Sequence, residues 1–344
     1  MADHTAIEWT DATWSPVTGC TLVSEGCRHC YAARLAATRL RDHPSRKGLA
    51  RINANGEAKF TGEVRFNPQW LDQPLRWRKP RMIFVCAHGD LFHEDVPDEW
   101  IDKVFAVMAL APRHTFQVLT KRPKRASAYM SRRDARGRFP ALDYAALMAA
   151  TGRWSTPAIE DLSGRTSLPN VWLGTSVENQ PTADARIPHL LVTPAAVRFV
   201  SAEPLLGPVD LYGGDPDPRL GGVAAGPNVH LGQWWRHDDP ANAPPRPGID
   251  WVIAGGESGP GARPMHPDWA RSLRDQCAAA GVAFHFKQWG ECVPVASLGR
   301  TGPRLNIADH VTFDDGTVVR RVGKSRAGRL LDGVQHNGMP EVRR

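Results

Sequence analysis

The sequence contains no run of eighteen consecutive apolar residues, so neither a transmembrane helix nor a membrane partner is expected. Its first residues, MADHTAIEWTDATW, contain no basic stretch followed by an apolar one, which a secretory signal peptide would require. Both absences predict a cytoplasmic protein. With 42% hydrophobic and 23% charged residues among its 344, the chain has the composition of a globular protein with a buried core.

Cysteine is scarce, and six cysteines in a reducing compartment do not indicate a disulfide framework. Three of them stand singly among apolar neighbours, where cysteine is usually a small buried hydrophobic residue. These three are Cys86, Cys277 and Cys292. The other three lie within eleven residues and have the spacing C-x6-C-x2-C.

This spacing, formed by Cys20, Cys27 and Cys30, favours an iron–sulfur site. Three thiolates on one loop can bind three irons of a [4Fe–4S] cube and leave the fourth iron open, as catalysis requires. Gly19 and Gly26 allow the loop to wrap around a metal centre. We therefore predict that these three cysteines are metal ligands.

A structural zinc site is the main alternative, with His29 or Cys86 as the fourth ligand. His29 is poorly placed for this role, because it lies between two ligands that are only three residues apart. No second pair of closely spaced cysteines is present, whereas a closed zinc site usually has one. Three thiols without a metal are the remaining alternative.

Short apolar runs alternate with helix-like segments along the chain. The runs are almost continuously apolar, which is typical of parallel strands covered on both faces. They span residues 82–87, 115–119, 171–174, 197–200, 251–254 and 283–287. Helices are expected over 97–110 and 266–280 and from about Tyr31 onward. The alternation predicts an α/β fold, a partial or full parallel (β/α) barrel.

We expect this barrel to occupy residues 1–299, with two loop insertions. Residues 131–169 have turn residues and no clear strand, and residues 204–249 contain nine prolines and eight glycines. Residues 300–344 are expected to form a basic extension packed on the barrel, with a hairpin over 311–319.

Polar residues follow most of the apolar runs. Parallel α/β folds bind their ligands at the carboxyl ends of strands, so these residues are candidates for binding a cofactor. The candidates are Asp90, Lys121, Ser176, Glu178, Glu203, Gly255, Gly256 and Glu257. For any one of them, a salt bridge, cap or tight turn at a strand end is an equal alternative.

Basic charge is concentrated in two segments, which suggests an anionic partner such as DNA or RNA. Residues 28–51 have a net charge of +6 and residues 113–138 of +8, so the rest of a chain of net charge +7 is at −7. The candidate nucleic-acid contacts are Lys121, Arg122, Lys124, Arg125, Arg132, Arg133 and Arg136. The alternative is that both segments are solvated surface.

The segments around the cysteines, residues 14–20 and 27–31, resemble a radical-SAM-like three-cysteine family named after phage gene products thirty-seven and sixty-eight. Further matches follow in order along the chain: DLFH at 90–93, LTKRP at 119–123, SAEP at 201–204, GGESG at 255–259, FKQWG at 286–290 and GRLLDG at 328–333. The pattern of Asp90 and Thr120-Lys121 also resembles the spore photoproduct lyase branch, which repairs DNA.

The resemblance implies a [4Fe–4S] cluster, S-adenosyl-L-methionine and an electron donor such as flavodoxin or ferredoxin. Reductive cleavage of the cofactor would give a 5′-deoxyadenosyl radical that abstracts a substrate hydrogen. The chain departs from the wider superfamily by three extra residues between its first two cysteines. Its Gly255-Gly256-Glu257 follows a late strand, so the superfamily role of binding the methionine amine is better assigned to Asp90.

We therefore expect a radical S-adenosylmethionine enzyme that modifies or repairs a nucleic acid or nucleotide. Cys86 and Cys292 are candidate hydrogen-atom donors, because each lies beside a predicted strand end. One alternative is a non-enzymatic nucleic-acid-binding protein in which an iron–sulfur or zinc centre only holds the loop together. A small metabolite or a peptide as substrate is the other.

Overall fold

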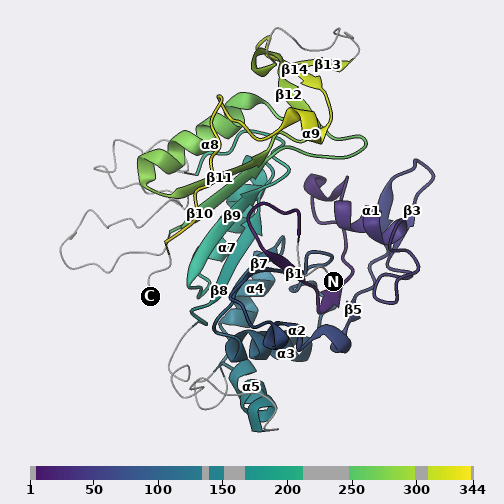
Figure 1. Cartoon of the computed structure of the whole chain (residues 1–344), viewed down its shortest axis with the longest axis vertical. Coiled ribbons are helices and arrows are strands. Elements are labelled where there is room, and N and C mark those ends of the chain that lie inside the picture. The colour runs from purple at the N-terminus through teal and green to yellow at the C-terminus, as the bar shows by residue number, and fades with distance from the viewer. Residues whose placement is uncertain (1–4, 134–138, 151–166, 212–247, 299–308, 342–344) are drawn as a thin grey trace, which may run out of the picture. The chain divides into compact units, whose positions relative to one another are not determined.

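The computed structural model describes residues 5–133, 139–150, 167–211, 248–298 and 309–341 (Figure 1). The chain forms two compact units. The first contains residues 1–175 and 192–198, and the second contains residues 176–191 and 199–344. In the described ranges no helix combines the length and the apolar character needed to cross a bilayer.

The first unit is built on four parallel strands in the order β1-β6-β7-β8. They are β1 (Ala12–Trp14), β6 (Met82–Val85), β7 (Thr115–Thr120) and β8 (Val171–Ser176). Every residue of β8 is buried, and β6 and β7 are buried over most of their length. The continuous apolar runs in the sequence reflect this burial on both faces.

Helices and short strands complete the first unit. The helices are α1 (Tyr31–Ala37), α2 (Gln73–Arg76), α3 (Asp98–Leu110), α4 (Pro123–Met130) and α5 (Ala141–Ala150), with 3-10 turns η1 (Glu25–Cys27) and η2 (Pro68–Trp70). The short strands pair antiparallel, β2 (Val17–Thr18) with β5 (Arg65–Phe66), and β3 (Ala50–Ile52) with β4 (Ala58–Phe60). Helix α3 begins after Pro97 with two acids in its first turn, and its apolar side is buried.

The second unit contains three parallel strands in the order β9-β10-β11. Its elements are α7 (Gln180–Leu191), β9 (Val197–Ala202), β10 (Trp251–Gly255), α8 (Pro267–Ala280), β11 (Ala283–Gln288), β12 (Cys292–Pro294), η4 (Val295–Ser297), β13 (His310–Thr312), β14 (Val318–Arg321) and α9 (Lys324–Ala327). Helix α8 is capped by His266 and ends at Gly281, which has the left-handed conformation that favours glycine.

The parallel strands β1 and β6 to β11 belong to one seven-stranded sheet, which confirms an α/β fold. The six predicted strands are all present, with most carboxyl ends one or two residues further along than expected. The hairpin expected over 311–319 is formed by β13 and β14. A barrel of radical-SAM type stays a prediction.

Two expectations about the connecting segments need correction or remain open. Residues 131–169 are more than an irregular loop, because α5 lies in them and packs against α3. Most of the loop predicted at 204–249 lies outside the described residues. The boundary predicted at residue 299 also stays a prediction. Residues beyond it nevertheless pair with β11, where Asn337 forms a bridge with His285.

Candidate functional site

The three predicted metal ligands lie on one loop of the first unit, residues 19–30, called the cysteine loop below. Cys20 follows β2, Cys27 ends η1, and Cys30 directly precedes α1. The loop begins at Gly19, whose φ is +94° and whose amide donates to the His88 carbonyl over 3.1 Å. A Cβ atom at Gly19 would lie 2.1 Å from the Glu63 carbonyl oxygen, so only glycine fits there.

Burial makes two of these thiols weak acids in the metal-free protein. The pKa of Cys20 is raised to about 12, first by burial and then by the Asp90 carboxylate, while Arg122 acts in the opposite direction. Burial also raises the pKa of Cys30, against the effects of the Ala32 and Ala33 amides and of Lys121. Both are protonated at neutral pH, so a metal would have to displace their protons on binding.

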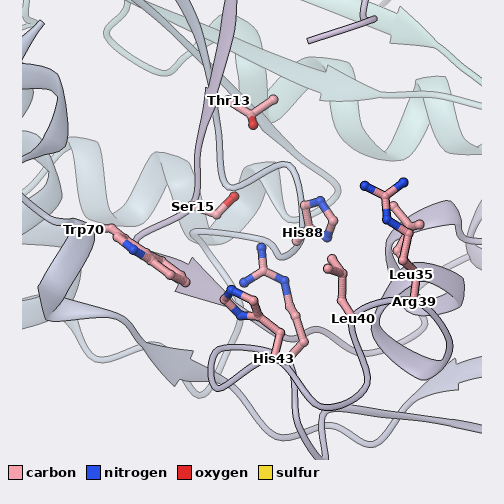
Figure 2. A pocket seen from close by; sticks show the side chains of 9 residues that line it. Thr13, Ser15, Leu35, Arg39, Leu40, His43, Trp70 and His88 are labelled. Carbon is pink, nitrogen blue, oxygen red and sulfur yellow. The ribbon is translucent and has the colours of Figure 1, made fainter. Parts of the chain in front are cut away.

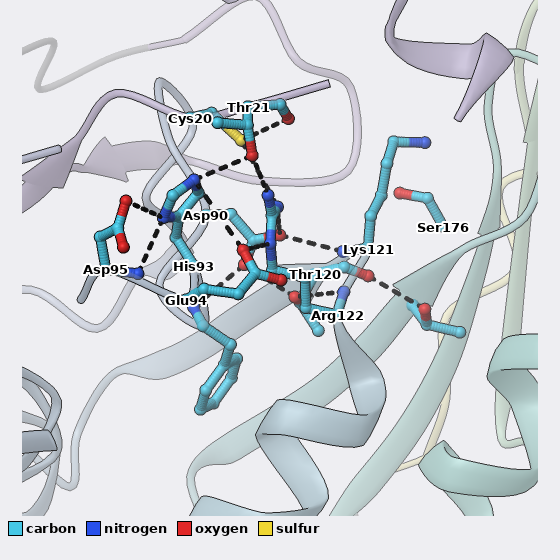
Figure 3. A network of polar contacts seen from close by, with 12 residues as sticks. Cys20, Thr21, Asp90, His93, Glu94, Asp95, Thr120, Lys121, Arg122 and Ser176 are labelled. Carbon is cyan, nitrogen blue, oxygen red and sulfur yellow. Dashed lines mark hydrogen bonds and ion pairs between the residues drawn. The ribbon is translucent and has the colours of Figure 1, made fainter. Parts of the chain in front are cut away.

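A buried arginine stands behind the first cysteine (Figure 3). The Arg122 side chain is 5% exposed, and its Nη1 lies 3.6 Å from the Cys20 sulfur and 3.1 Å from an Asp90 oxygen. Its Nε donates to Glu94 over 2.6 Å, and its Nη2 donates to the Thr21 hydroxyl over 2.5 Å. Two carboxylates therefore fix the guanidinium with one edge toward the thiol, and its pKa is raised.

Asp90 is the centre of this network rather than an open ligand. Its two oxygens accept hydrogen bonds from the Thr120 hydroxyl (2.7 Å), the Lys121 amide (3.1 Å) and the Phe92 amide (3.0 Å), in addition to Arg122. A carboxylate with four donors from its own chain is suited to holding Arg122 in place. Its predicted contact with the methionine amine would have to displace one of them.

His93 belongs to the same network, and the sequence interpretation did not give it a role. Its Nδ1 accepts from the Asp95 amide over 3.1 Å, so its Nε2 has the proton and donates to the Thr21 hydroxyl over 2.9 Å. Glu94 and Thr21 were missed as well. In this segment only Asp90 was marked by its place at a strand end, and His93 appeared only within the motif DLFH of the family resemblance.

The separation of the thiols bears on the choice between zinc and a cluster. Three thiolates on one tetrahedral zinc ion, each about 2.3 Å from it, lie about 3.8 Å apart. In the described residues only His266, Asp268 and Asp315 bring three ligand atoms within 4.8 Å of one another. The three loop sulfurs do not, with or without His29 or Cys86. The described cysteines are therefore not arranged as a zinc or cluster site, and the [4Fe–4S] cluster stays a prediction.

The acids predicted to bind a cofactor from the second unit all have internal partners. The fully buried Glu178 accepts from Arg186 over 3.0 Å. Glu203 pairs with Lys287 over 3.3 Å. The side chain and amide of Arg263 both bind Glu257, at 2.7 and 2.8 Å. These contacts match the salt-bridge alternative at strand ends.

Close packing explains why glycine occupies positions 255 and 256, two of the residues predicted to bind a cofactor. A Cβ atom at Gly256 would lie 2.0 Å from the Trp289 carbonyl oxygen, and one at Gly255 would lie 2.5 Å from a Glu203 oxygen. Ser176, the last residue of β8, accepts from Arg186 through its carbonyl over 2.7 Å. These residues have no geometry that assigns them to a cofactor.

The single cysteines proposed as hydrogen donors are both buried. Cys86 is 2% exposed and has a φ of 55°, which is unusual for a residue other than glycine. Burial raises its pKa to about 12. Cys292 lies in β12 and is 1% exposed. The pKa of Cys292 is raised as well, so both thiols keep the S–H bond that a hydrogen-atom donor needs, and this role stays a prediction.

The second basic segment does not present the free positive face that was expected. Arg122 is buried in the network above, and both Arg125 and Arg132 pair with Asp98. Arg133 donates to main-chain carbonyls, Lys124 is exposed, and Arg136 lies outside the described residues. The first segment differs, because most of its cations are exposed. They are Arg28, Arg34, Arg39, Arg41, Lys47 and Arg51.

Fold and site together define an α/β protein with a three-cysteine loop backed by a buried ion-pair network. The family described as "Protein of unknown function (DUF5131)" matches residues 4–340, so the chain belongs to that family. No curated protein and no solved structure matches the chain.

Proposed function

We propose that the protein is a radical S-adenosylmethionine enzyme whose [4Fe–4S] cluster is bound by Cys20, Cys27 and Cys30. The observation that supports this most is the buried Arg122 guanidinium 3.6 Å from the Cys20 sulfur. Donors to cluster sulfurs set the stability and potential of iron–sulfur centres, and three thiolates need nearby positive charge. A centre that only held the loop together would not need a cation fixed by two carboxylates.

The residues around the loop have separate tasks in this proposal. A bound cluster and S-adenosylmethionine would supply a carbon radical able to abstract hydrogen from a substrate. Arg122 donates toward Cys20, and Asp90 and Glu94 hold the guanidinium in that position. Lys121 adds positive charge near Cys30. Cys20 is partly buried, and because its pKa is raised, metal binding there releases its proton.

The substrate we propose is a nucleic acid or one of its nucleotides, with a flavodoxin or ferredoxin as electron donor. Four exposed cations of segment 28–51 support the anionic partner, because they form no ion pair among the described residues. They are Arg34, Arg39, Lys47 and Arg51, whereas Arg28 and Arg41 pair with Glu57 and Asp42. The paired cations of segment 113–138 do not support it. A non-enzymatic nucleic-acid-binding protein would use the same surface, and the tests below separate it from the enzyme.

The first test is anaerobic reconstitution of the full chain with iron and sulfide. We expect broad absorption near about 400 nm, typical of thiolate-ligated iron–sulfur centres. Each of Cys20→Ala, Cys27→Ala and Cys30→Ala should abolish it. The control Cys277→Ala, in a buried thiol of α8, should retain it. Bound zinc without iron in the wild type would overturn the proposal.

The second test measures cleavage of S-adenosylmethionine and binding of nucleic acid in separate experiments. The reduced, reconstituted protein should convert S-adenosylmethionine to 5′-deoxyadenosine, and a cluster without this activity would favour the non-enzymatic alternative. Labelled oligonucleotides should bind with an affinity that falls with salt, by about one unit of log–log slope per phosphate neutralised. Arg34→Glu, Arg41→Glu and Arg51→Glu combined should flatten that slope. No binding at low salt would remove nucleic acid as the partner.

A further inference from the structure

A cavity of about 360 Å³ opens in the first unit, and Figure 2 shows the side chains that line it. It is as large as a small-molecule site needs to be. Two features join it to the cysteine loop. Helix α1, which begins directly after Cys30, supplies Leu35 to its lining, and the carbonyl of the lining residue His88 accepts from Gly19.

The lining is cationic, and none of its residues is acidic. Arg46 is buried, at 4% exposure. Arg39 and His43 are exposed and lie at the mouth, while His88 is partly buried. Trp70 also lines the cavity, with its ring 5.6 Å from that of His43 and the two planes 37° apart.

Arg46 is a buried cation with no counterion in the described part of the chain. Its Nη1 donates to the Ser45 hydroxyl, and its Nε has no hydrogen-bond partner. Burial lowers its pKa to about 10, and no carboxylate opposes that effect. Its side chain is therefore still charged at neutral pH. A guanidinium is rarely buried without an anion, because losing its hydration is costly.

The neighbouring groups extend this site. Arg39, which lines the same cavity, forms no ion pair among the described residues. The Nδ1 of His88 has no partner either. Two guanidinium groups with imidazole nitrogens suit a phosphate, which offers several acceptor oxygens and up to two negative charges. The indole of Trp70 suits a flat ring on the same ligand.

We propose that this cavity binds a nucleotide, with its phosphate on Arg46 and its base against Trp70. Arg39 and His43 contact the same phosphate from the mouth. The nucleotide is either free or the 5′ end of a strand, since both offer the same phosphate and base. The site goes beyond the proposed radical chemistry and does not depend on it, because no cysteine takes part.

Isothermal titration of the full chain tests the proposal with adenosine 5′-monophosphate, inorganic phosphate, adenosine and a 5′-phosphorylated trinucleotide. The nucleotide should bind more tightly than phosphate or adenosine. Arg46→Gln should weaken it at least about tenfold, the effect of losing a hydrogen bond to a charged group. The control Arg76→Gln, a half-exposed residue of the same unit paired with Asp72, should bind as the wild type does.

Two further measurements keep the outcome decisive. Arg46→Gln should be at least as stable to urea as the wild type, because it removes an unpaired buried charge. Trp70→Leu should weaken the nucleotide but not inorganic phosphate. A trinucleotide that binds more tightly than the mononucleotide identifies a strand end, and the reverse order identifies a free nucleotide.

The proposal is overturned if Arg46→Gln binds the nucleotide normally, or if it unfolds more easily, which would make Arg46 a structural residue. It is also overturned if the nucleotide binds no more tightly than inorganic phosphate. Cys20→Ala should bind the nucleotide with unchanged affinity. Failure of the cluster proposal would therefore leave this result untouched.

Discussion

Replacing Asp90 with alanine should destabilise the whole first unit, rather than only weaken a cofactor site. Asp90 is 5% exposed and accepts four hydrogen bonds, including one from Arg122. Without it the Arg122 side chain, itself 5% exposed, keeps only one carboxylate, that of Glu94, whose side chain is 65% exposed. Breaking a buried pair from one side costs about 3–5 kcal/mol, a large part of a typical total stability of about 5–15 kcal/mol.

Urea denaturation of the metal-free chain, followed by circular dichroism, measures this loss. The control is Asp95→Ala in the same turn, where the side chain is 72% exposed and a change within about 0.5 kcal/mol is expected. Asp90→Ala combined with Arg122→Met should recover part of the loss, since the uncompensated charge is gone. If Asp90→Ala is as stable as Asp95→Ala, the network does not hold the fold and our account of it is wrong.

Two further predictions concern the second unit. Burial lowers the pKa of His285 from 6.5 to about 4, so between these values the unfolded chain binds a proton that the folded chain does not. Stability should therefore fall as the pH falls through this window, by up to about 3 kcal/mol, and His285→Gln should flatten the pH profile of the urea midpoint. Gly256→Ala should cost about 1–3 kcal/mol, because its Cβ would meet the rigid Trp289 carbonyl at 2.0 Å. Gly255→Ala should cost less in the same urea titration, since it meets chiefly the flexible end of Glu203.

The sequence was sufficient to locate strands whose residues are all buried. The runs that became β8 and β10 are apolar throughout, because neighbours cover both of their faces. Strand β1 was missed for the opposite reason. Its Ala12 and Trp14 are buried, but Thr13 between them lines the cavity, so three residues give no continuous apolar signal.

The position of the candidate site could be predicted from the sequence, but the ion pairs among its charged side chains could not. Spacing alone drew attention to the cysteines, and strand ends drew attention to Asp90 and Arg122. Whether a charge is free depends on partners far along the chain, as with Arg125, which pairs with Asp98. The net charge of a segment includes Arg125 but does not reveal that Asp98, outside that segment, neutralises it. The expected basic face over 113–138 therefore looked stronger in the sequence than it is in the fold.

Two buried arginines of the first unit illustrate how pairing separates structure from function. Arg122 has two carboxylates, and its pKa is raised, whereas Arg46 has none, and its pKa is lowered from 12.5 to about 10. Replacing either arginine with methionine keeps a side chain of similar length but removes the positive charge. Arg122→Met should lower stability, because it leaves Asp90 buried without its cation.

Arg46→Met should instead raise stability in the absence of ligand, by at most about 3 kcal/mol, the equivalent of its pKa shift. We therefore expect the urea midpoint to fall below that of the wild type in Arg122→Met and to rise above it in Arg46→Met. Adding adenosine 5′-monophosphate should stabilise the wild type and Arg122→Met but not Arg46→Met, because only a protein that binds the ligand gains from it. A drop in stability for both variants would mean that Arg46 has a counterion within the fold, and that the cavity has no charge to offer a phosphate.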